Sequence, residues 1–161
     1  VGQEVTEKGK QIYTFSHYSA MQPYGKDSVV SGQLMDWGGM YAEILESIYT
    51  DKWNNEDLWW LAKEKAALLG GSTTDMINPK FVPELKKAMI DTKEFGKISA
   101  YDLVMKRYEQ MQQGVDVFEP FTGPIADNKG AIQIPAGAKA SKQDLLSIMY
   151  YVDNVEGDIP Q

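Results

Sequence analysis

The chain has 161 residues, of which 43% are hydrophobic, and its formal net charge is −7. This length fits one ordinary domain, and the negative charge disfavours nucleic acid and anionic membrane surfaces as partners, because both would repel it. The absence of cysteine excludes disulfides, thiol catalysis and cysteine-ligated zinc, and no run of eighteen apolar residues predicts a membrane-spanning helix.

Helical and extended patterns alternate along the first half of the chain. Residues 3–10 resemble the end of an amphipathic helix that closes near Gly9, and since the chain begins inside this pattern without a methionine, we expect the natural N-terminus to lie upstream. Alternation, turn residues and helical spacing predict the next elements. They are a strand over 11–18, a turn over 22–27, a strand over 28–34, a helix from an N-cap at Asp36 to about Asp51, and a short buried strand over 66–69. The apolar face of that helix comprises Trp37, Tyr41, Ile44, Leu45 and Ile48.

Two helices are predicted in the middle of the chain. Pro83 suits the first turn of a helix over 81–95. The second helix covers 99–114, where Ser99 and Asp102 have the spacing of a capping box and Gly114 is the stop.

The last part of the chain predicts a hairpin and a terminal helix. The turn 127–130 joins strands over 121–125 and 131–134, with Gly130 at positive φ. Ser141 and Asp144 form a second capping box that opens a helix over 141–152. The alternation of strands and helices predicts an α/β fold.

No catalytic constellation is found in the sequence. His17 is the single histidine, and it lies in a predicted strand between aromatic residues, where a structural role is the more common one. No Gly-x-Ser-x-Gly elbow, phosphate-binding glycine loop or EF-hand spacing is present. The sequence therefore predicts a protein without enzymatic activity, cofactor or metal.

Aromatic residues are abundant, with four Trp and nine Tyr. They can serve as ordinary core packing, or they can form a stacking surface for a flat, uncharged ligand such as a nucleobase. Periodicity does not decide between these two interpretations.

Three stretches resemble one known family. "FTGPIADNKGAIQIPAG" (121–137) and "LLSIMYYVDNVEGDIP" (145–160) resemble the C-terminal signature of the basic membrane protein family, the substrate-binding lipoproteins of bacterial ABC importers related to the purine nucleoside receptor. The segment 16–53, which contains "MDWG", resembles the family's strand, hinge crossing and helix. The resemblance implies the C-terminal half of a type I periplasmic-binding-protein clamshell, made of Rossmann-like three-layer lobes. It spans residues 1–161, with a helical insertion at about 72–116, and strand 28–34 would cross between the lobes.

The resemblance also implies a ligand cleft between the lobes. Its expected lining residues are His17, Tyr18, Ser19, Met21, Met35, Asp36 and Trp37. Nucleoside receptors of the family hold ribose with an aspartate and a lysine, and the matching positions here are Tyr18 or Ala20 for the acid and Met35 for the base. Because neither charge is present, the resemblance favours a free purine base over a nucleoside.

The partners follow from the same resemblance. They are a small-molecule ligand (a purine base or nucleoside) and an ABC permease, and nucleic acid is not expected. The protein would be extracytoplasmic, either periplasmic or anchored to the cell membrane by a lipid. A companion N-terminal segment or self-association would cover the faces that this half of the fold leaves open. The alternative is a regulatory or assembly module that keeps the later half of the fold and binds no small molecule.

Overall fold

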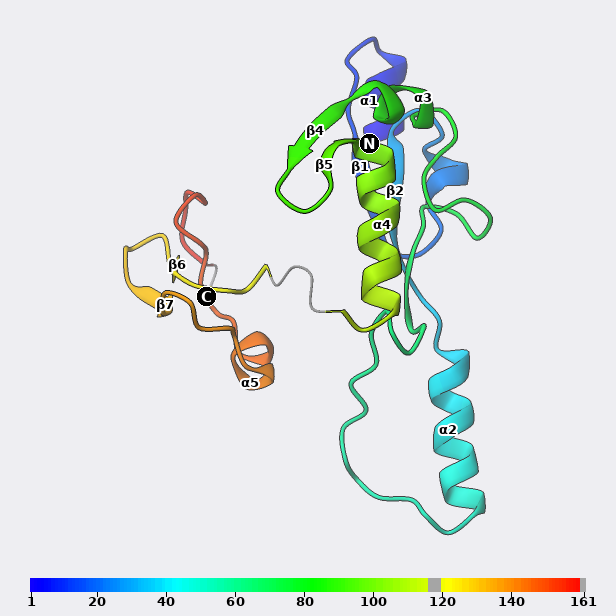
Figure 1. The fold of residues 1–161 in the computed structure, drawn as a ribbon, viewed down its shortest axis with the longest axis vertical. Helices are drawn as coiled ribbons and strands as arrows, with labels where there is room; N and C mark the ends of the chain where they lie inside the picture. The colour runs from blue at the N-terminus through cyan, green and yellow to red at the C-terminus, as the bar shows by residue number, and fades with distance from the viewer. Residues whose placement is uncertain (116–119, 160–161) are drawn as a thin grey trace. The chain divides into compact units, whose positions relative to one another are not determined.

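A computed structural model describes residues 1–115 and 120–159 of the chain. The chain forms two compact units, Val1–Val115 and Asp116–Gln161. The elements of each unit are shown in Figure 1. Together they make a mixed α/β chain, which confirms the predicted fold class at that level. Residue 116, the far boundary of the predicted insertion, lies outside the described residues.

The first unit is built on a three-stranded sheet in the order β1-β2-β3. Strands β1 (Thr14–Tyr18) and β2 (Val29–Met35) are parallel, and β3 (Ala67–Leu69) pairs antiparallel with the last residues of β2. The connection between β1 and β2 holds a short 3-10 helix, η1 (Gln22–Tyr24), in place of an α-helix. All three strands confirm the predicted positions, although β1 begins three residues later than expected, and β3 is half-buried and not buried as predicted.

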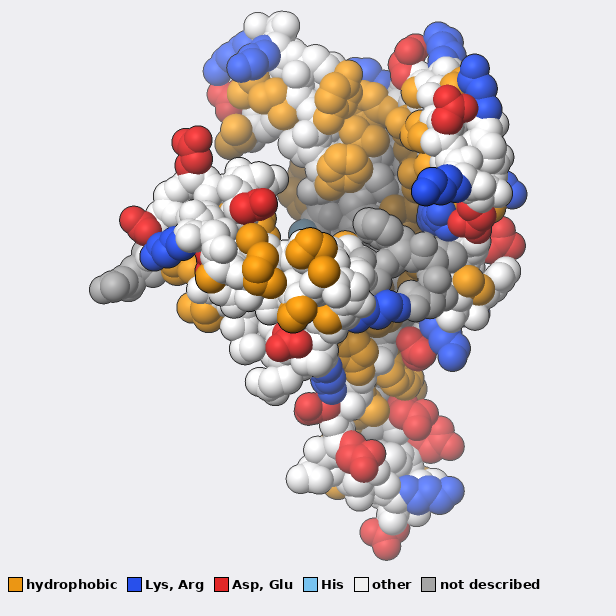
Figure 2. Space-filling view, turned by 60° about the vertical axis from the view of Figure 1, so that its left-hand side comes forward, with side chains coloured by type: hydrophobic (Ala, Val, Ile, Leu, Met, Phe, Trp, Pro, Cys, Tyr) orange, Lys and Arg blue, Asp and Glu red, His pale blue; other side chains and the backbone are white. Residues whose placement is uncertain are grey.

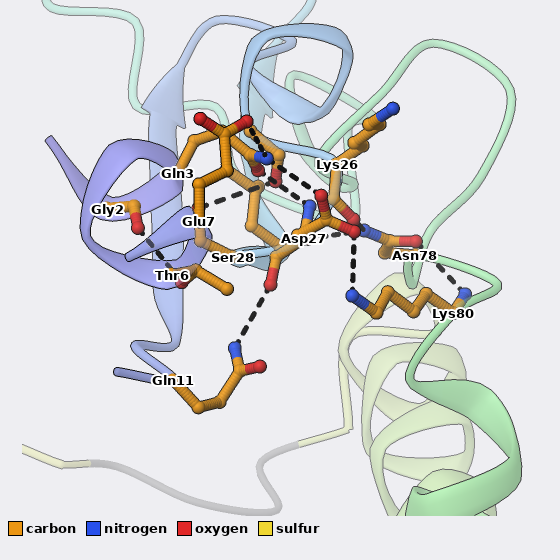
Figure 3. Close-up of polar contacts among 12 residues, drawn as sticks. Gly2, Gln3, Thr6, Glu7, Gln11, Lys26, Asp27, Ser28, Asn78 and Lys80 are labelled. Atoms are coloured by element: carbon orange, nitrogen blue, oxygen red, sulfur yellow. Dashed lines mark hydrogen bonds and ion pairs between the residues drawn. The ribbon is translucent and has the colours of Figure 1, made fainter. Parts of the chain in front are cut away.

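Helix α1 (Gly2–Glu7) ends at the predicted place, followed by Gly9 at φ +87°. Asp27 joins it to the amino end of β2 (Figure 3). The side chain of Gln3 donates to Asp27 Oδ2 at 2.7 Å and accepts from the Asp27 backbone N–H at 2.8 Å. Lys80 Nζ donates to the other carboxylate oxygen at 2.7 Å. We call this group, Gln3, Asp27, Asn78 and Lys80, the Asp27 junction.

Asn78 completes the Asp27 junction from the buried side. Its side-chain amide donates to the carbonyls of Lys26 at 3.0 Å and Val29 at 2.8 Å, and its backbone N–H donates to Val30. Its exposed fraction is 4%. The segment that follows β3 is therefore fixed against the start of β2 by hydrogen bonds from its own backbone and side chain.

Helix α2 (Gly38–Tyr49) leaves the carboxyl end of β2, and residues 50–66 return from it to β3 as an open loop (Figure 1). The prediction of Asp36 as the N-cap is wrong by one residue, because Trp37 occupies that position with helical φ and ψ. The Asp36 carboxylate still accepts the Gly38 N–H at 2.9 Å, so it satisfies one of the free N–H groups at the helix start.

The region between β3 and the second unit contains two helices and a hairpin. They are α3 (Val82–Lys87), β4 (Met89–Thr92), β5 (Gly96–Ser99) and α4 (Ala100–Gln112). Pro83 lies in the first turn of α3, and the Ser99 side chain caps α4 by accepting from the Asp102 N–H, both as predicted.

The predicted helix over 81–95 is wrong beyond residue 87, because the chain turns there into the hairpin β4–β5. Tertiary contacts at the hairpin tip explain the difference. Glu94 accepts from Arg107 at 2.7 Å, and the Phe95 ring lies under the charged groups of Lys106 and Arg107 on α4. Gly96, at φ +63°, allows the tight turn that these contacts need. The region is thus not wholly helical, and whether it is an insertion stays a prediction.

The second unit contains the predicted hairpin, with short strands β6 (Ile125–Ala126) and β7 (Ile132–Ile134). Gly130 has φ +84°, as predicted for its turn. The capping box of Ser141 and Asp144 is confirmed at the start of α5 (Lys142–Leu146). The prediction that this helix continues to 152 is wrong, since it ends at Leu146.

Few hydrophobic side chains are buried in the described part of the chain. They are Val29, Ala66, Ile77, Phe81 and Ile134. Many large apolar side chains reach the surface, as Figure 2 shows for one face of the molecule. No helix among the described residues is both long and apolar enough to cross a bilayer.

Candidate functional site

The carboxyl ends of β1 and β2 bring most of the predicted ligand-binding residues to one place. The strands are parallel, with His17 paired to Gln33 and Tyr18 to Leu34, so both end at the same edge of the sheet. Trp37 follows directly as the N-cap of α2. Segments 17–19 and 35–37 therefore meet because the strand register aligns them.

Four rings form a continuous row at this edge, which we call the aromatic ladder: His17, Tyr18, Trp37 and Tyr41. The rings of His17 and Tyr18 are stacked, with centroids 3.9 Å apart and an interplanar angle of 24°. Tyr18 meets Trp37 edge-on at 6.5 Å, and Trp37 stacks on Tyr41 at 6.4 Å and 22°. The ladder is open to solvent, with exposed fractions of 55% for Tyr18, 44% for Trp37 and 59% for Tyr41.

The backbone of Tyr18 explains how two neighbouring residues of a strand can stack. Successive side chains in a strand point to opposite faces of the sheet. Tyr18 breaks this alternation because its φ is +63°, in the left-handed region that a bulky residue rarely adopts. Such strained residues are often found at functional sites. The strain here turns the Tyr18 ring onto His17 and starts the aromatic ladder.

Tyr41 is the functional candidate that sequence reasoning did not assign to the site. The sequence pattern placed Tyr41, four residues after Trp37, on the apolar face of the helix. That same spacing places the two rings on one side of α2 and would have indicated the pair. The exposure of both rings shows that this part of the face is a surface and not a core contact.

Met35 and Asp36 lie between the two halves of the ladder in sequence. Met35 is half-buried, and its Sδ lies 2.7 Å from Gln33 Nε2. Asp36 is exposed, its carboxylate accepts the Gly38 N–H, and its backbone N–H donates to Ala66 at 2.8 Å. The site therefore offers flat rings with one carboxylate beside them.

Met21 and Ser19 are placed differently from the ladder. Ser19 is exposed at the end of β1. Met21 lines a separate hollow of about 250 Å³ against α1, where its neighbours include Phe15, Ser16 and Tyr24. The hydroxyl of Ser16 is buried there without a hydrogen-bond partner among the described residues. The structure thus assembles His17, Tyr18 and Trp37 but sets Met21 apart.

The largest hollow described lies in the second unit, with a volume of about 900 Å³. Two of its polar side chains, Asp127 and Gln133, are already engaged in the hairpin. The Asp127 carboxylate accepts from the N–H groups of Ala131 and Lys129, each at 2.9 Å, and from the Gln133 amide at 2.8 Å. These bonds, first the one from Ala131 and then the one from Gln133, lower the pKa of Asp127. Since Asp127 stabilises the turn, we assign it a structural role.

Metal binding is not indicated by the described residues, in which no three His, Cys, Asp or Glu side chains gather closely enough to hold an ion. The chemistry that the aromatic ladder can support is stacking on a planar molecule.

A comparison with known proteins finds a weak similarity. No protein-family model matches the chain. The chain is 25% identical over 150 residues to a purine-binding protein of Brucella abortus (strain 2308), and the match covers 93% of the chain and 36% of that protein. The chain therefore spans about a third of the length of this curated relative. The similarity is weak, and it is consistent with the family resemblance of the sequence motifs.

Proposed function

We propose that this chain is part of a solute-binding protein of a bacterial ABC importer, and that its aromatic ladder holds a purine base or a related nucleoside-like solute. The observation that carries the proposal is the row of exposed rings at the carboxyl ends of two parallel strands. Ligands of α/β proteins commonly bind at such strand ends. The name of the relative, a purine-binding protein, supports purines as the ligand class.

Stacking supplies the binding energy in this proposal. A purine is flat and aromatic, and each stack of a base on an aromatic side chain contributes about 1–3 kcal/mol. Trp37 is the central ring, since it contacts Tyr18 on one side and Tyr41 on the other. A ligand that covers its exposed face removes apolar ring surface from water.

The polar groups beside the ladder favour a base over a sugar. The exposed carboxylate of Asp36 can accept a hydrogen bond from a ring N–H or an exocyclic amino group, and such charge-assisted bonds are strong. A ribose grip by an acid and a lysine is not available at Tyr18, Ala20 and Met35. We therefore place free purine bases ahead of nucleosides as ligands.

The finer architecture and the biological setting belong to the same proposal. The unit around β1 and β2 would be part of a type I periplasmic-binding-protein clamshell, and closure of its lobes over the ligand would signal the permease. The protein would act outside the cytoplasm, in the periplasm or on a lipid anchor, without catalytic turnover. The family resemblance of the motifs supports each of these points.

One alternative is favoured by the openness of the ladder. Binding sites for small molecules usually enclose most of the ligand, whereas Trp37 and Tyr41 lie on an open surface. A regulatory or assembly module that keeps this fold without binding a solute would also leave these rings exposed.

Calorimetric titration distinguishes the solute-binding protein from the module without a ligand. The purified chain is titrated with adenine, guanine, hypoxanthine and the matching nucleosides. The proposal expects saturable binding of at least one base, weaker binding of its nucleoside, and loss of the signal in Trp37→Ala. Trp53→Ala, which removes an exposed Trp outside the ladder, is the matched control and should bind as the unmodified chain does. No binding of any purine would support the module without a ligand, and release of free base from a nucleoside would contradict a non-enzymatic role.

A further inference from the structure

Two hydrogen bonds restrain Asp36 beside Trp37, the central ring of the aromatic ladder. The Asp36 backbone N–H donates to the Ala66 carbonyl at 2.8 Å, and the carboxylate atom Oδ1 accepts the Gly38 N–H at 2.9 Å. The second bond spans the backbone of Trp37, since residues 36 and 38 flank it in the chain. The carboxylate is therefore already oriented at the start of α2 before any ligand arrives.

Gly38 gives the carboxylate the room that this arrangement needs. A Cβ atom at position 38 would lie 3.1 Å from Asp36 Oδ1, which is closer than ordinary van der Waals contact. A residue with a side chain at the first position of α2 would thus push the carboxylate away from the helix start. The close approach of Asp36 depends on the glycine.

The Asp36 carboxylate keeps free capacity for hydrogen bonds. Within the described part of the chain, its Oδ2 atom has no hydrogen-bond partner and no Lys or Arg forms an ion pair with it. The residue is exposed. An ionised carboxylate accepts about four hydrogen bonds and donates none, so both oxygens can still accept from a ligand. The group is therefore suited to a molecule that presents N–H donors.

Purine bases differ in the donors that they present on one edge. Guanine carries its ring N1–H and its exocyclic 2-amino group side by side, so two N–H groups point in the same direction. Hypoxanthine has the same rings and the same oxo group but lacks the amino group. Adenine places its amino group beside a ring nitrogen that accepts. Two parallel N–H donors match the two oxygens of a carboxylate, as they do in the bidentate pair of arginine with a carboxylate.

We propose that Asp36 is the specificity-determining residue of the aromatic ladder and that it selects guanine-type bases, whose ring N1–H and amino N–H donate to its two oxygens. The inference rests on the proposed function, because it needs a base that stacks on Trp37. It adds the edge of the base that is recognised and the residue that recognises it. Hypoxanthine and adenine keep the stack on the ladder and lose at least one of the two charge-assisted bonds.

The test combines two ligands with two proteins in equilibrium dialysis at micromolar concentration. The unmodified chain should bind guanine about tenfold more tightly than hypoxanthine, since these bases differ only in the amino group and its bond is to a charged oxygen. In Asp36→Asn the ratio should fall to about twofold or less, because the amide offers one acceptor and one donor to a pair of donors. Asparagine can still accept the Gly38 N–H, so the helix start is retained.

Glu46→Gln is the matched control, because it removes one exposed carboxylate from α2 outside the aromatic ladder. It should keep the preference of the unmodified chain for guanine. Loss of the preference in this control would trace it to net charge and overturn the inference.

The outcomes separate this inference from the proposed function. Binding of neither base would overturn both. Binding of both bases with equal affinity, or a preference for guanine that survives in Asp36→Asn, would overturn the inference and leave stacking on the ladder in place. The comparison of the two bases on the unmodified chain needs no variant to fold, so the inference can fail on that measurement alone.

Discussion

The two ends of strand β2 differ in their surroundings. The amino end, around Ser28 and Val29, is buried and is held by hydrogen bonds from other segments of the first unit. The carboxyl end, from Met35 to Trp37, leads to exposed aromatic rings. The Asp27 junction satisfies its polar groups internally (Figure 3). The aromatic ladder leaves its ring faces available to another molecule. The comparison teaches that one short strand is anchored at one end and free to bind at the other.

The largest effect on this comparison is expected from Asn78→Ala at the anchored end. The change leaves the carbonyls of Lys26 and Val29 without their donor. The bond to Val29 is buried, and a buried carbonyl that loses its partner costs about 1–3 kcal/mol, whereas the bond to the exposed Lys26 adds less. We expect the free energy of unfolding in urea to fall by about 2–4 kcal/mol. Asn54→Ala, at an exposed loop position, is the control and should change it little. Equal losses from both variants would show that the Asp27 junction is not an anchor.

The second effect is expected from Trp37→Ala at the open end. Purine binding measured by calorimetry should weaken by about 1–3 kcal/mol, the usual contribution of one base stack. The free energy of unfolding should fall by less than the roughly 3–5 kcal/mol that removal of a core Trp costs, because Trp37 is 44% exposed. The opposite ordering of these two losses would place Trp37 in the core and end the contrast between the two ends of β2.

The third effect concerns the strained backbone of Tyr18 and is read from two variants together. Tyr18→Asn and Tyr18→Ala both remove the ring, but asparagine tolerates the left-handed region better than alanine does. The asparagine variant should therefore unfold with a free energy about 1 kcal/mol higher than the alanine variant. Equal stabilities would mean that residue 18 is not held at positive φ in solution.

The smallest effect is the pH dependence at the Asp27 junction, where the groups are partly exposed. Hydrogen bonds from Lys80 and then from Gln3 lower the pKa of Asp27 from its ordinary value of 3.8. A carboxyl group with a lowered pKa in the folded state stabilises the fold above the ordinary value, and this contribution is lost as the pH falls through the lowered value. The difference in Tm between the unmodified chain and Asp27→Asn should therefore shrink as the pH falls from about 5 to about 2. A difference that stays constant would show that Asp27 is not coupled to its partners.

Elements whose hydrogen bonds are local could be predicted from the sequence. Ser99 caps α4 and Ser141 caps α5 through bonds to residues three positions later, and Gly130 serves a turn defined by its immediate neighbours. The hairpin β4–β5 could not be predicted, because the contacts of Glu94 and Phe95 with α4 override the local preference for helix.

The candidate site shows the same division between local and distant causes. The meeting of segments 17–19 and 35–37 was predicted by the family resemblance, and the parallel register of β1 and β2 produces it. The stacking of His17 on Tyr18 was not predicted, because it depends on one left-handed residue that the strand pattern does not reveal. Tyr41 belongs to the aromatic ladder because its ring stacks on Trp37, which lies at the N-cap of α2.

The short connection between β1 and β2 has a consequence for the order in which the chain folds. His17 pairs with Gln33, whereas the partner of Gln33 on β3 is Leu69, so the second pairing must close a loop more than twice as long. Contacts between nearby residues carry the smaller entropy cost and tend to form first. Stopped-flow folding of variants in β1 and in β3 would reveal the order, since substitutions in the early pair slow folding and those in the late strand speed unfolding. On a ribosome, β1 and β2 could therefore pair, and three rings of the ladder could meet, once the chain has emerged as far as Trp37 and before β3 has been synthesised.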